Sequence, residues 1–437
     1  IILFLPLILE PSFALASVYP DADALSVAPC DGSPCLGNIR VRFTRPMRTD
    51  LTHSLTAEIW DGTVFDPVAT DGTRFAWSKT FRPNDTLNIY ISWIWFPETS
   101  KIRFTLPASQ FQSTVGDNQP ADIQQTFDTT GNKQTFPVAD TGMSQCSNSA
   151  AGLVPCSVGA YPSQDGDFTN VPNARSFTGP TAHAAYTADY TTIDKVTGVR
   201  WKSCSEGLSG ATCATGVATT VVWEDSVNAC ALLNQANSGA GYWGLSNWRL
   251  PTQSELASIT SHTQASPSID AANFPGTLSA IYWASGNFAN GMRARSVRFV
   301  NGTVSSGVGD LRNGTDTANV RCVSSPDTVQ LPSFSDNGDG TVSDLRTGLR
   351  WQKCSRGQSN DSACSGAVTQ GTWQSNLAYC NGLTLGSHAN ASSWRLPNLR
   401  ELNSIYFVGN SNATMEAAYF PNTPTATIYV SSTTRAN

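Results

Sequence analysis

Apolar and polar residues alternate along several short stretches in the first third of the chain. In NIRVRFTRPM the apolar residues Ile39, Val41 and Phe43 alternate with polar ones, which is the pattern of a half-buried strand. TLNIYISW, KIRFTL and DIQQTFDTT continue this alternation, with turn residues between them. Several short strands within residues 17–131 predict an all-β sandwich.

A helical period follows in two later stretches, WEDSVNACALLNQA and WQSNLAYCNGL. A hairpin pattern precedes each of them, since TTIDKVTGVRWKSC and DGTVSDLRTGLRWQKC both contain two short runs around a Thr-Gly turn. Apolar residues recur at helical spacing, so each stretch predicts an amphipathic helix with a cysteine on its buried side. These positions are Trp223, Val227, Cys230 and Leu233 in the first stretch and Trp373, Leu377, Cys380 and Leu383 in the second.

The two patterned regions are copies of one another. TGVRWKSC recurs as TGLRWQKC, NWRLPTQSEL as SWRLPNLREL, and YWAS as YVSS, always in the same order. We infer a duplicated α+β domain. Repeat one spans residues 161–327 and repeat two spans 328–437. Repeat two stops soon after YVSS, so we expect it to be truncated.

The WRLP segment of each repeat contains the pattern of a helix start. Pro251 ends the preceding extended segment, because a proline disfavours the helical conformation of the residue before it. Thr252 has Glu255 three positions later, and Asn398 has Glu401, which is the spacing of a reciprocal helix cap. We interpret the segment as structural, with its tryptophan in the core and its arginine bonded to a carbonyl or carboxylate of the same domain. A catalytic Glu/Arg pair is the alternative. The motif residues are Trp248, Arg249, Pro251, Thr252, Glu255, Trp394, Arg395, Pro397, Asn398 and Glu401.

Eleven cysteines suit an exported protein in which disulfides persist. The repeat alignment and the local spacings predict five bonds. They are Cys30–Cys35, Cys146–Cys156, Cys204–Cys213, Cys230–Cys322 and Cys354–Cys364. Cys380 would then stay unpaired, because repeat two stops before the counterpart of Cys322.

Composition and charge narrow the function classes. Charged residues make up 14% of the chain, against about 25% in average domains, and there are 12 Trp. Such polar, weakly charged chains suit extracellular β-rich domains. The net charge of −6 leaves no section basic enough for binding a phosphate backbone, so we do not expect a nucleic-acid partner.

The chain opens with IILFLPLILEPSFALAS. The apolar run is too short to cross a bilayer, and Ala14-Leu15-Ala16 forms a cleavage pattern. We predict a partial signal peptide at residues 1–16 and no transmembrane segment in the mature chain. The alternative is a buried strand at the edge of a fragment.

No enzymatic constellation is visible among the residues. The four histidines do not recur at matching repeat positions, and no Cys-His, Ser-His-Asp or HExxH arrangement is found. We therefore expect neither catalysis nor a cofactor. Asp336, Asp339 and Asp344 offer oxygen ligands of the kind that calcium uses, but their spacing is not that of an EF-hand. We favour an Asp/Gly turn that leads into a strand.

A candidate ligand surface lies late in repeat one. GMRARSVRF places Arg293 and Arg295 on one face of an extended segment and Arg298 on the other. Arginine suits sulfate and carboxylate groups, and Tyr282 and Trp283 have rings on which sugars stack. The alternatives are a solvated strand face for the arginines and a core position for one of the aromatic residues.

Several of these motifs occur together in a known family. DNGDGTVSDLRTGLRWQKC, the Trp/Cys helix, WRLPNLREL and FPNT closely resemble the Lcl_C family, named for the C-terminal domain of the Legionella collagen-like adhesin. The resemblance implies a C-type-lectin-like fold, surface exposure and binding of sulfated glycans. RLPTQSEL also looks like a segment of formylglycine-generating enzymes, which share that fold. FTRPM and FDTT look like a bacterial Ig-like domain.

We therefore expect a multidomain protein in which an Ig-like sandwich (17–131) and a Cys-containing linker (132–160) precede two C-type-lectin-like repeats. We expect an exported, non-catalytic bacterial adhesion or recognition protein that binds sulfated or acidic glycans of a host or matrix surface without calcium. The first alternative is an envelope or matrix component whose domains are spacers and self-association modules. The second is an enzyme of the formylglycine-generating type. The family's trimer does not carry over, because the chain has no collagen-like stalk and its domains are in tandem, so no oligomeric state is predicted.

Overall fold

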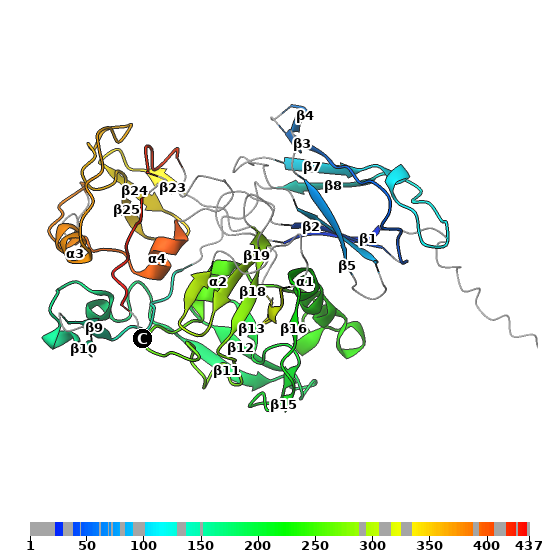
Figure 1. Cartoon of the computed structure of the whole chain (residues 1–437), viewed down its shortest axis with the longest axis horizontal. Coiled ribbons are helices and arrows are strands. Elements are labelled where there is room, and N and C mark those ends of the chain that lie inside the picture. Colours follow the sequence, from blue (N-terminus) through cyan, green and yellow to red (C-terminus); the bar gives the residue numbers. More distant parts are fainter. Residues whose placement is uncertain are drawn as a thin grey trace, which may run out of the picture.

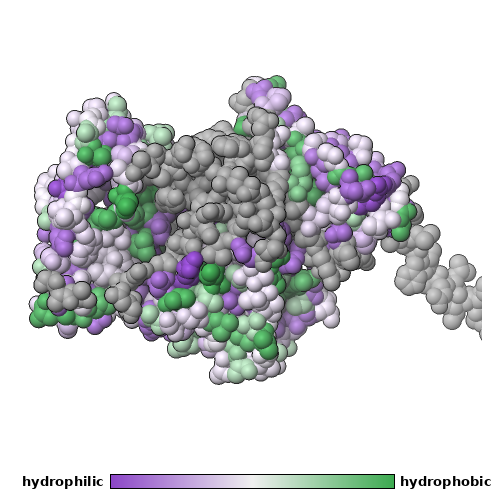
Figure 2. Space-filling view, viewed as in Figure 1, coloured by the Kyte–Doolittle hydropathy of each residue, from purple (hydrophilic) through white to green (hydrophobic). Residues whose placement is uncertain are grey.

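The structure, a computed structural model, shows a β-rich chain of several packed units (Figure 1). In Figure 2, hydrophobic residues on the described part of the visible face lie in small groups among hydrophilic ones. The structure describes residues 22–28, 38–43, 45–60, 63–68, 70, 73–78, 84–90, 101–128, 137–148, 152–287, 294–305, 316–324, 334–387, 393–405, 417–424 and 427–434. The predicted signal peptide and the Cys30–Cys35 bond lie outside these residues.

The N-terminal unit contains two antiparallel sheets of four described strands each. The first has the order β1 (Ala22–Ala28), β2 (Asn38–Phe43), β6 (Thr86–Tyr90), β5 (Arg74–Ser78). The second has the order β4 (Phe65–Val68), β3 (Thr56–Trp60), β7 (Lys101–Leu106), β8 (Ile123–Asp128). Val41 and Leu87 of the first sheet share one buried cluster with Phe104 and Ile123 of the second. The two sheets therefore pack face to face, as the alternating pattern predicted.

Repeat one is built on two sheets of five described strands each. The first has the order β11 (Phe177–Ala182), β12 (Tyr190–Asp194), β13 (Arg200–Lys202), β22 (Val323–Ser324), β17 (Trp248–Arg249). The second has the order β16 (Thr220–Val221), β21 (Ala318–Asn319), β18 (Ile281–Asn287), β19 (Ala294–Arg298), β20 (Thr303–Ser305). A small hairpin pairs β14 (Leu208–Ser209) with β15 (Thr215–Gly216).

Two helices cover these sheets, α1 (Trp223–Leu232) and α2 (Gln253–Ser258). The predicted hairpin is present, since β12 pairs with β13. Asp194 closes its turn by accepting hydrogen bonds from the backbone N–H of Val196 at 2.9 Å and the hydroxyl of Thr197 at 2.9 Å.

Repeat two has the same order of elements: β23 (Phe334–Asp336), β24 (Thr341–Asp344), β25 (Arg350–Gln352), α3 (Trp373–Asn381) and α4 (Leu399–Ser404). Hydrogen bonds repeat at matching positions in the two copies. Trp223 Nε1 donates to the carbonyl of Ala284, and Trp373 Nε1 donates to that of Ser431, both at 2.8 Å. The hydroxyls of Tyr282 and Ser205 are 2.7 Å apart, as are those of Tyr429 and Ser355. The copies therefore share the contacts that hold the fold together as well as sequence motifs.

The segment of residues 137–175, which combines most of the predicted linker (132–160) with the predicted start of repeat one, is packed against both repeats. It forms a hairpin of β9 (Gln145–Ser147) and β10 (Leu153–Pro155), followed by the short helices η2 (Cys156–Val158) and η3 (Asp165–Phe168). In Figure 1 this hairpin lies beside repeat two. The backbone N–H of Asp165 donates to the carbonyl of Ser432 at 3.1 Å. The side-chain amide of Asn398 donates to the carbonyl of Val171 at 3.3 Å. We call residues 137–175 the docking segment.

Arg400 joins the docking segment and both repeats. It lies on α4, which contacts α2, and its guanidinium donates to the backbone carbonyls of Asp140 and Thr260. Its side chain is buried, and burial lowers the pKa of Arg400 to about 9. Removing such a group from water is unfavourable unless its donors are satisfied, so these carbonyl bonds are needed for packing here.

The pKa of Asp165 in the docking segment is raised by burial, although the Thr141 hydroxyl donates to this carboxylate. A folded-state pKa above the unfolded value means that the stabilisation is present below the ordinary Asp pKa and is lost as pH rises through the folded pKa. We expect Asp165→Asn to be more stable than the parent at pH 7, with the gain disappearing below about pH 4. Urea unfolding at the two pH values measures this. An Asn variant that is less stable at pH 7 would contradict it.

Candidate functional site

The first candidate site is the WRLP segment of repeat one. Arg249 and Glu255 form a bidentate pair, with Nη1–Oε2 and Nη2–Oε1 distances of 2.8 and 2.7 Å. The Glu255 carboxylate also accepts the backbone N–H of Thr252 at 2.8 Å, and the Thr252 hydroxyl accepts the backbone N–H of Glu255 at 3.1 Å. This is the reciprocal cap of α2 that the spacing predicted.

Burial and charge act in opposite directions on Glu255. Burial alone raises the pKa of this carboxyl, but Arg249 and the hydrogen bonds of Thr252 outweigh it and hold the pKa below its ordinary value. Glu255 is 0% exposed and Trp248 and Leu250 beside it are also buried. The oxygens of this carboxylate are occupied by donors of its own domain, so the geometry favours the structural interpretation.

Repeat two repeats this arrangement. Arg395 donates to both carboxylate oxygens of Glu401, and the backbone N–H of Asn398 donates to Glu401 Oε2 at 2.8 Å. The Asn398 side chain accepts the backbone N–H of Glu401 at 2.9 Å. Since Thr252 and Asn398 both complete the cap, the exchange of threonine for asparagine leaves the helix start unchanged.

The second candidate site is the set of Arg, Tyr and Trp residues late in repeat one, and three of these side chains are buried. Tyr282 and Trp283 are 0% and 1% exposed, and their polar atoms bond within the domain to Ser205 and the carbonyl of Val221. Arg295 is buried and donates to the side chain of Gln253 at 2.7 Å. Of the predicted set, Arg298 is exposed, and Arg293 lies outside the described residues. The prediction of a shared ligand face is therefore wrong for these three buried side chains.

The acidic residues of repeat two are occupied by hydrogen bonds rather than gathered for a cation. Asp344 accepts the backbone N–H of Arg346 and the hydroxyl of Thr347, as its counterpart Asp194 does in repeat one. Asp336 pairs with Lys353 at 2.6 Å. Asp339 accepts the N–H groups of Thr341 and Ser387, and its hydrogen bonds hold its pKa far below the ordinary value. These contacts agree with the Asp/Gly turn that we favoured.

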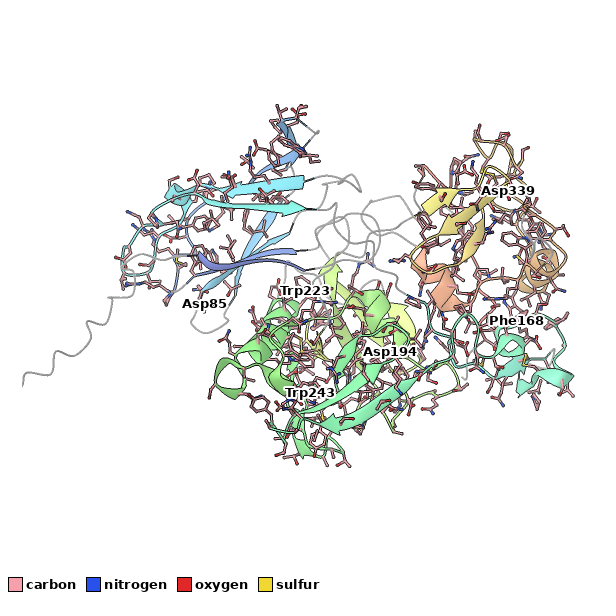
Figure 3. The ribbon with its side chains drawn as sticks, turned by 180° about the vertical axis from the view of Figure 1, so that it is seen from behind. Asp85, Phe168, Asp194, Trp223, Trp243 and Asp339 are labelled. Carbon is pink, nitrogen blue, oxygen red and sulfur yellow. A yellow bond between two sulfur atoms is a disulfide. The ribbon has the colours of Figure 1, made fainter. Side chains whose placement is uncertain are left out.

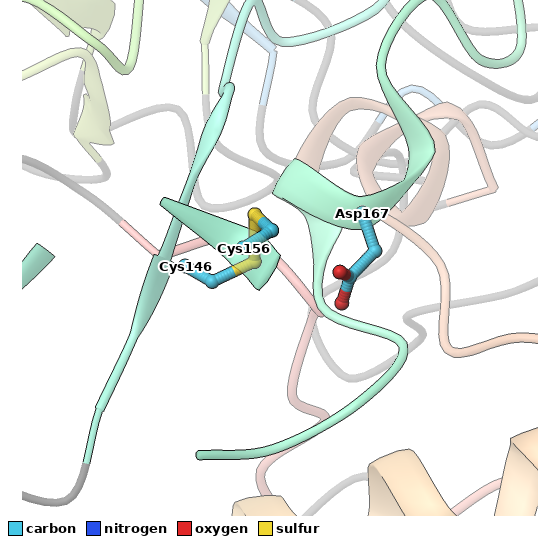
Figure 4. Close-up of side chains that lie close together, drawn as sticks. All are labelled: Cys146, Cys156 and Asp167. Atoms are coloured by element: carbon cyan, nitrogen blue, oxygen red, sulfur yellow. A yellow bond between two sulfur atoms is a disulfide. The ribbon is translucent and has the colours of Figure 1, made fainter. Parts of the chain in front are cut away.

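Cys146, Cys156 and Asp167 form the one cluster with metal-ligand spacing among the described residues (Figure 4). The two sulfur atoms form a disulfide with an S–S distance of 2.08 Å. A disulfide offers no thiolate, and the thiolate is the form that binds a metal. This cluster is therefore a covalent clip within the docking segment.

The disulfides of the described residues are Cys146–Cys156, Cys204–Cys213, Cys230–Cys322 and Cys354–Cys364. They are four of the five pairs that the repeat alignment and the local spacings predicted. Cys380, the counterpart of Cys230, is a free thiol in the structure, and burial raises its pKa to about 11. At neutral pH it is protonated, so it is a poor nucleophile.

An aromatic cluster on repeat one was not predicted from the sequence. Trp243, His183 and Tyr186 are half-buried. The His183 ring stacks on Tyr186 at 4.9 Å and meets the Trp243 ring at 5.0 Å and 68°. The guanidinium of Arg200 lies 4.0 Å from the centre of the Trp243 ring. We call these four residues the aromatic corner; Figure 3 labels Trp243 in repeat one.

The sequence does carry a signal for the aromatic corner. Cys230 and Trp248 are 18 positions apart, whereas Cys380 and Trp394 of repeat two are 14 apart. The longer connection of repeat one contains the Tyr-Trp-Gly sequence at 242–244. Tyr242 and Trp243 therefore lie in a stretch that repeat one has and repeat two lacks, which marks them as a feature of one copy.

A comparison with known families agrees with the duplicated architecture. The family described as Lcl C-terminal domain matches residues 190–324 and 340–437, more than half of the chain. The chain belongs to the Lcl C-terminal domain family. No curated protein matches it. Membership indicates a surface protein of adhesin type, and the two matched ranges correspond to the repeats.

The two Lcl C-terminal domains differ at the aromatic corner. Arg200 of the first domain corresponds to Arg350 of the second, because both precede the tryptophan of the hairpin. Arg350 is exposed, whereas Arg200 is half-buried against Trp243. Burial lowers the pKa of Arg200. The shared Lcl fold therefore positions an arginine in both copies, and the insertion adds the rings around it in one.

Proposed function

We propose that this chain is a secreted or surface-exposed bacterial recognition protein that binds sulfated or acidic glycans without catalysis and without calcium. In this proposal the N-terminal sandwich is Ig-like and both Lcl domains have a C-type-lectin-like fold. The observation that carries the proposal is the tandem of Lcl C-terminal domains, since the family indicates a surface protein of adhesin type.

Covalent structure supports export. Four disulfides stabilise the described residues, and such bonds persist in oxidising compartments. Among the described residues, no helix is both long and apolar enough to cross a bilayer. The oxygen atoms of Asp336, Asp339 and Asp344 are engaged by protein donors, which favours a mode of binding in which arginine rather than calcium contacts the glycan.

A glycan array tests the proposal with the whole chain. The array holds sulfated, uronate-containing and neutral oligosaccharides and is read with and without EDTA. We expect binding to the acidic members that EDTA does not change. A silent array together with concentration-dependent self-association in solution would overturn glycan recognition in favour of a spacer and self-association role. Loss of binding with EDTA would overturn calcium independence.

A further inference from the structure

We propose that the aromatic corner of repeat one, formed by His183, Tyr186, Arg200 and Trp243, is a binding site for the ring of an acidic sugar. The identity of the ligand as a glycan rests on the proposed function. The location of the site does not, because the contacts of these four residues define it.

The rings provide a stacking surface with a defined corner. His183 and Trp243 meet at 68°, and Tyr186 stacks on one face of the His183 ring with an interplanar angle of 16°. Indole and phenol rings combine a large apolar face with a polar edge, so they are favoured where a ligand is partly apolar and partly wet. A pyranose ring has this character, with C–H groups on its faces and hydroxyls around its edge.

Arg200 supplies the charge. Its Nη1 donates to the Thr191 hydroxyl at 3.0 Å, and no carboxylate forms an ion pair with it in the part of the chain that the structure describes. The guanidinium lies 4.0 Å from the centre of the indole ring, and a guanidinium fixed on a ring binds carboxylate and tetrahedral oxyanions with little further loss of conformational freedom. A uronate carboxylate and a sulfate ester both fit this group.

His183 adds a directed donor. Its Nδ1 accepts the backbone N–H groups of Ala185 and Tyr186, each at 3.2 Å. In a neutral imidazole whose Nδ1 is an acceptor, the proton is on Nε2. The structure therefore leaves Nε2 as a hydrogen-bond donor at the corner, suited to a sugar hydroxyl.

Hydrogen bonds to Asp189 fix the conformation of the loop that carries Trp243. Trp243 has a positive φ of 55°, a conformation that costs about 1–3 kcal/mol in a residue with a side chain and persists where surrounding contacts enforce it. The contacts come from Asp189, which is 9% exposed and accepts the Trp243 N–H at 2.8 Å and the Asn237 side-chain amide at 2.7 Å. Asp189 thus fixes the backbone at Trp243, and the half-buried ring packs against the buried cluster that contains Trp223 and Trp248.

The test uses the full chain and three probes: a tetragalacturonate, a sulfated tetrasaccharide and a neutral cellotetraose. Affinity is measured by isothermal titration calorimetry. We expect an acidic probe to bind and the neutral one to bind more weakly; the two acidic arms separate carboxylate from sulfate. Trp243→Ala should weaken binding by about thirtyfold, the effect of removing a central aromatic contact.

Matched variants keep the result interpretable. Arg200→Gln should weaken acidic binding and abolish the preference over the neutral probe, whereas the equivalent Arg350→Gln in repeat two should leave both unchanged. Trp243→Phe keeps a ring and should retain binding within a few fold, which decides the matter if the alanine variant does not fold. Parent affinity in Trp243→Ala and Arg200→Gln would overturn this site and leave glycan recognition standing elsewhere. Silence of the parent chain toward every acidic probe would overturn both.

Discussion

Replacing Cys230 and Cys322 together by serine should lower the free energy of unfolding by about 4–5 kcal/mol. The bond ties α1 to the segment before β22 across a sequence separation of 92 residues. In the chain-entropy account, a long closed loop stabilises because the bond restricts the unfolded chain. Both sulfur atoms are buried beside Trp223 and Trp248, so the bond also holds together the buried cluster that these side chains form in repeat one.

The matched control is Cys204→Ser with Cys213→Ser in the same repeat. That bond has a sequence separation of 9, for which the same relation gives roughly 3 kcal/mol. Equilibrium denaturation of the two double variants under oxidising conditions compares them. Equal losses would contradict the loop-length explanation and assign the effect to local packing.

Replacing Glu255 by glutamine should destabilise the protein by about 3–5 kcal/mol, because the change leaves the charge of Arg249 without its buried partner. The Arg249 side chain is 12% exposed and that of Glu255 is 0% exposed, so water replaces little of the lost interaction. Thermal and urea unfolding of the full chain measure the change.

Glu58→Gln is the control for this prediction. Glu58 pairs with Arg103 at 2.6 Å, but both side chains are about a quarter or more exposed, and such pairs add little to stability. We expect a much smaller loss there. A Glu255→Gln variant with parent stability that had lost glycan affinity would instead give the WRLP segment a direct role in binding.

Local signals in the sequence were sufficient for the elements and the duplication. The Thr252/Glu255 spacing predicted the start of α2, because a helix cap is formed by residues three positions apart. The spacing did not identify the partner of Arg249, for which we expected a carbonyl or a carboxylate of the same domain. That pairing depends on how the chain turns at Pro251, which spacing alone does not specify.

The prediction of a ligand surface on β19 was wrong because an assumption of the alternation rule does not hold there. The rule assumes that one face of a strand meets solvent. In β19 both faces are covered, since Val297 packs into one buried cluster and Ala294 into the other. Tyr282 and Trp283 of β18 divide between the same two clusters. A strand between two cores can bury an arginine, and Arg295, which donates to the side chain of Gln253, is such a residue.

The sequence did not predict the packing of the docking segment, because residues 132–160 have the composition of a linker. Several of its polar side chains are buried and bond to backbone groups. Gln164 is 0% exposed; its side chain accepts the N–H of Ser147 and donates to the carbonyls of Ser147 and Tyr161. Partners of this kind lie far apart in sequence or in an irregular loop, so neither periodicity nor composition reveals them.

The docking segment also has a consequence for the order in which the chain acquires its structure. A chain emerges from the ribosome with its N-terminus first. Val171 is therefore synthesised 227 residues before its partner Asn398, and Gln145 is synthesised 289 residues before its partner Thr434. Most of repeat one can fold in the interval, whereas repeat two joins a segment that was synthesised before most of repeat one. The docking segment must therefore stay available until the residues of repeat two that contact it have been synthesised.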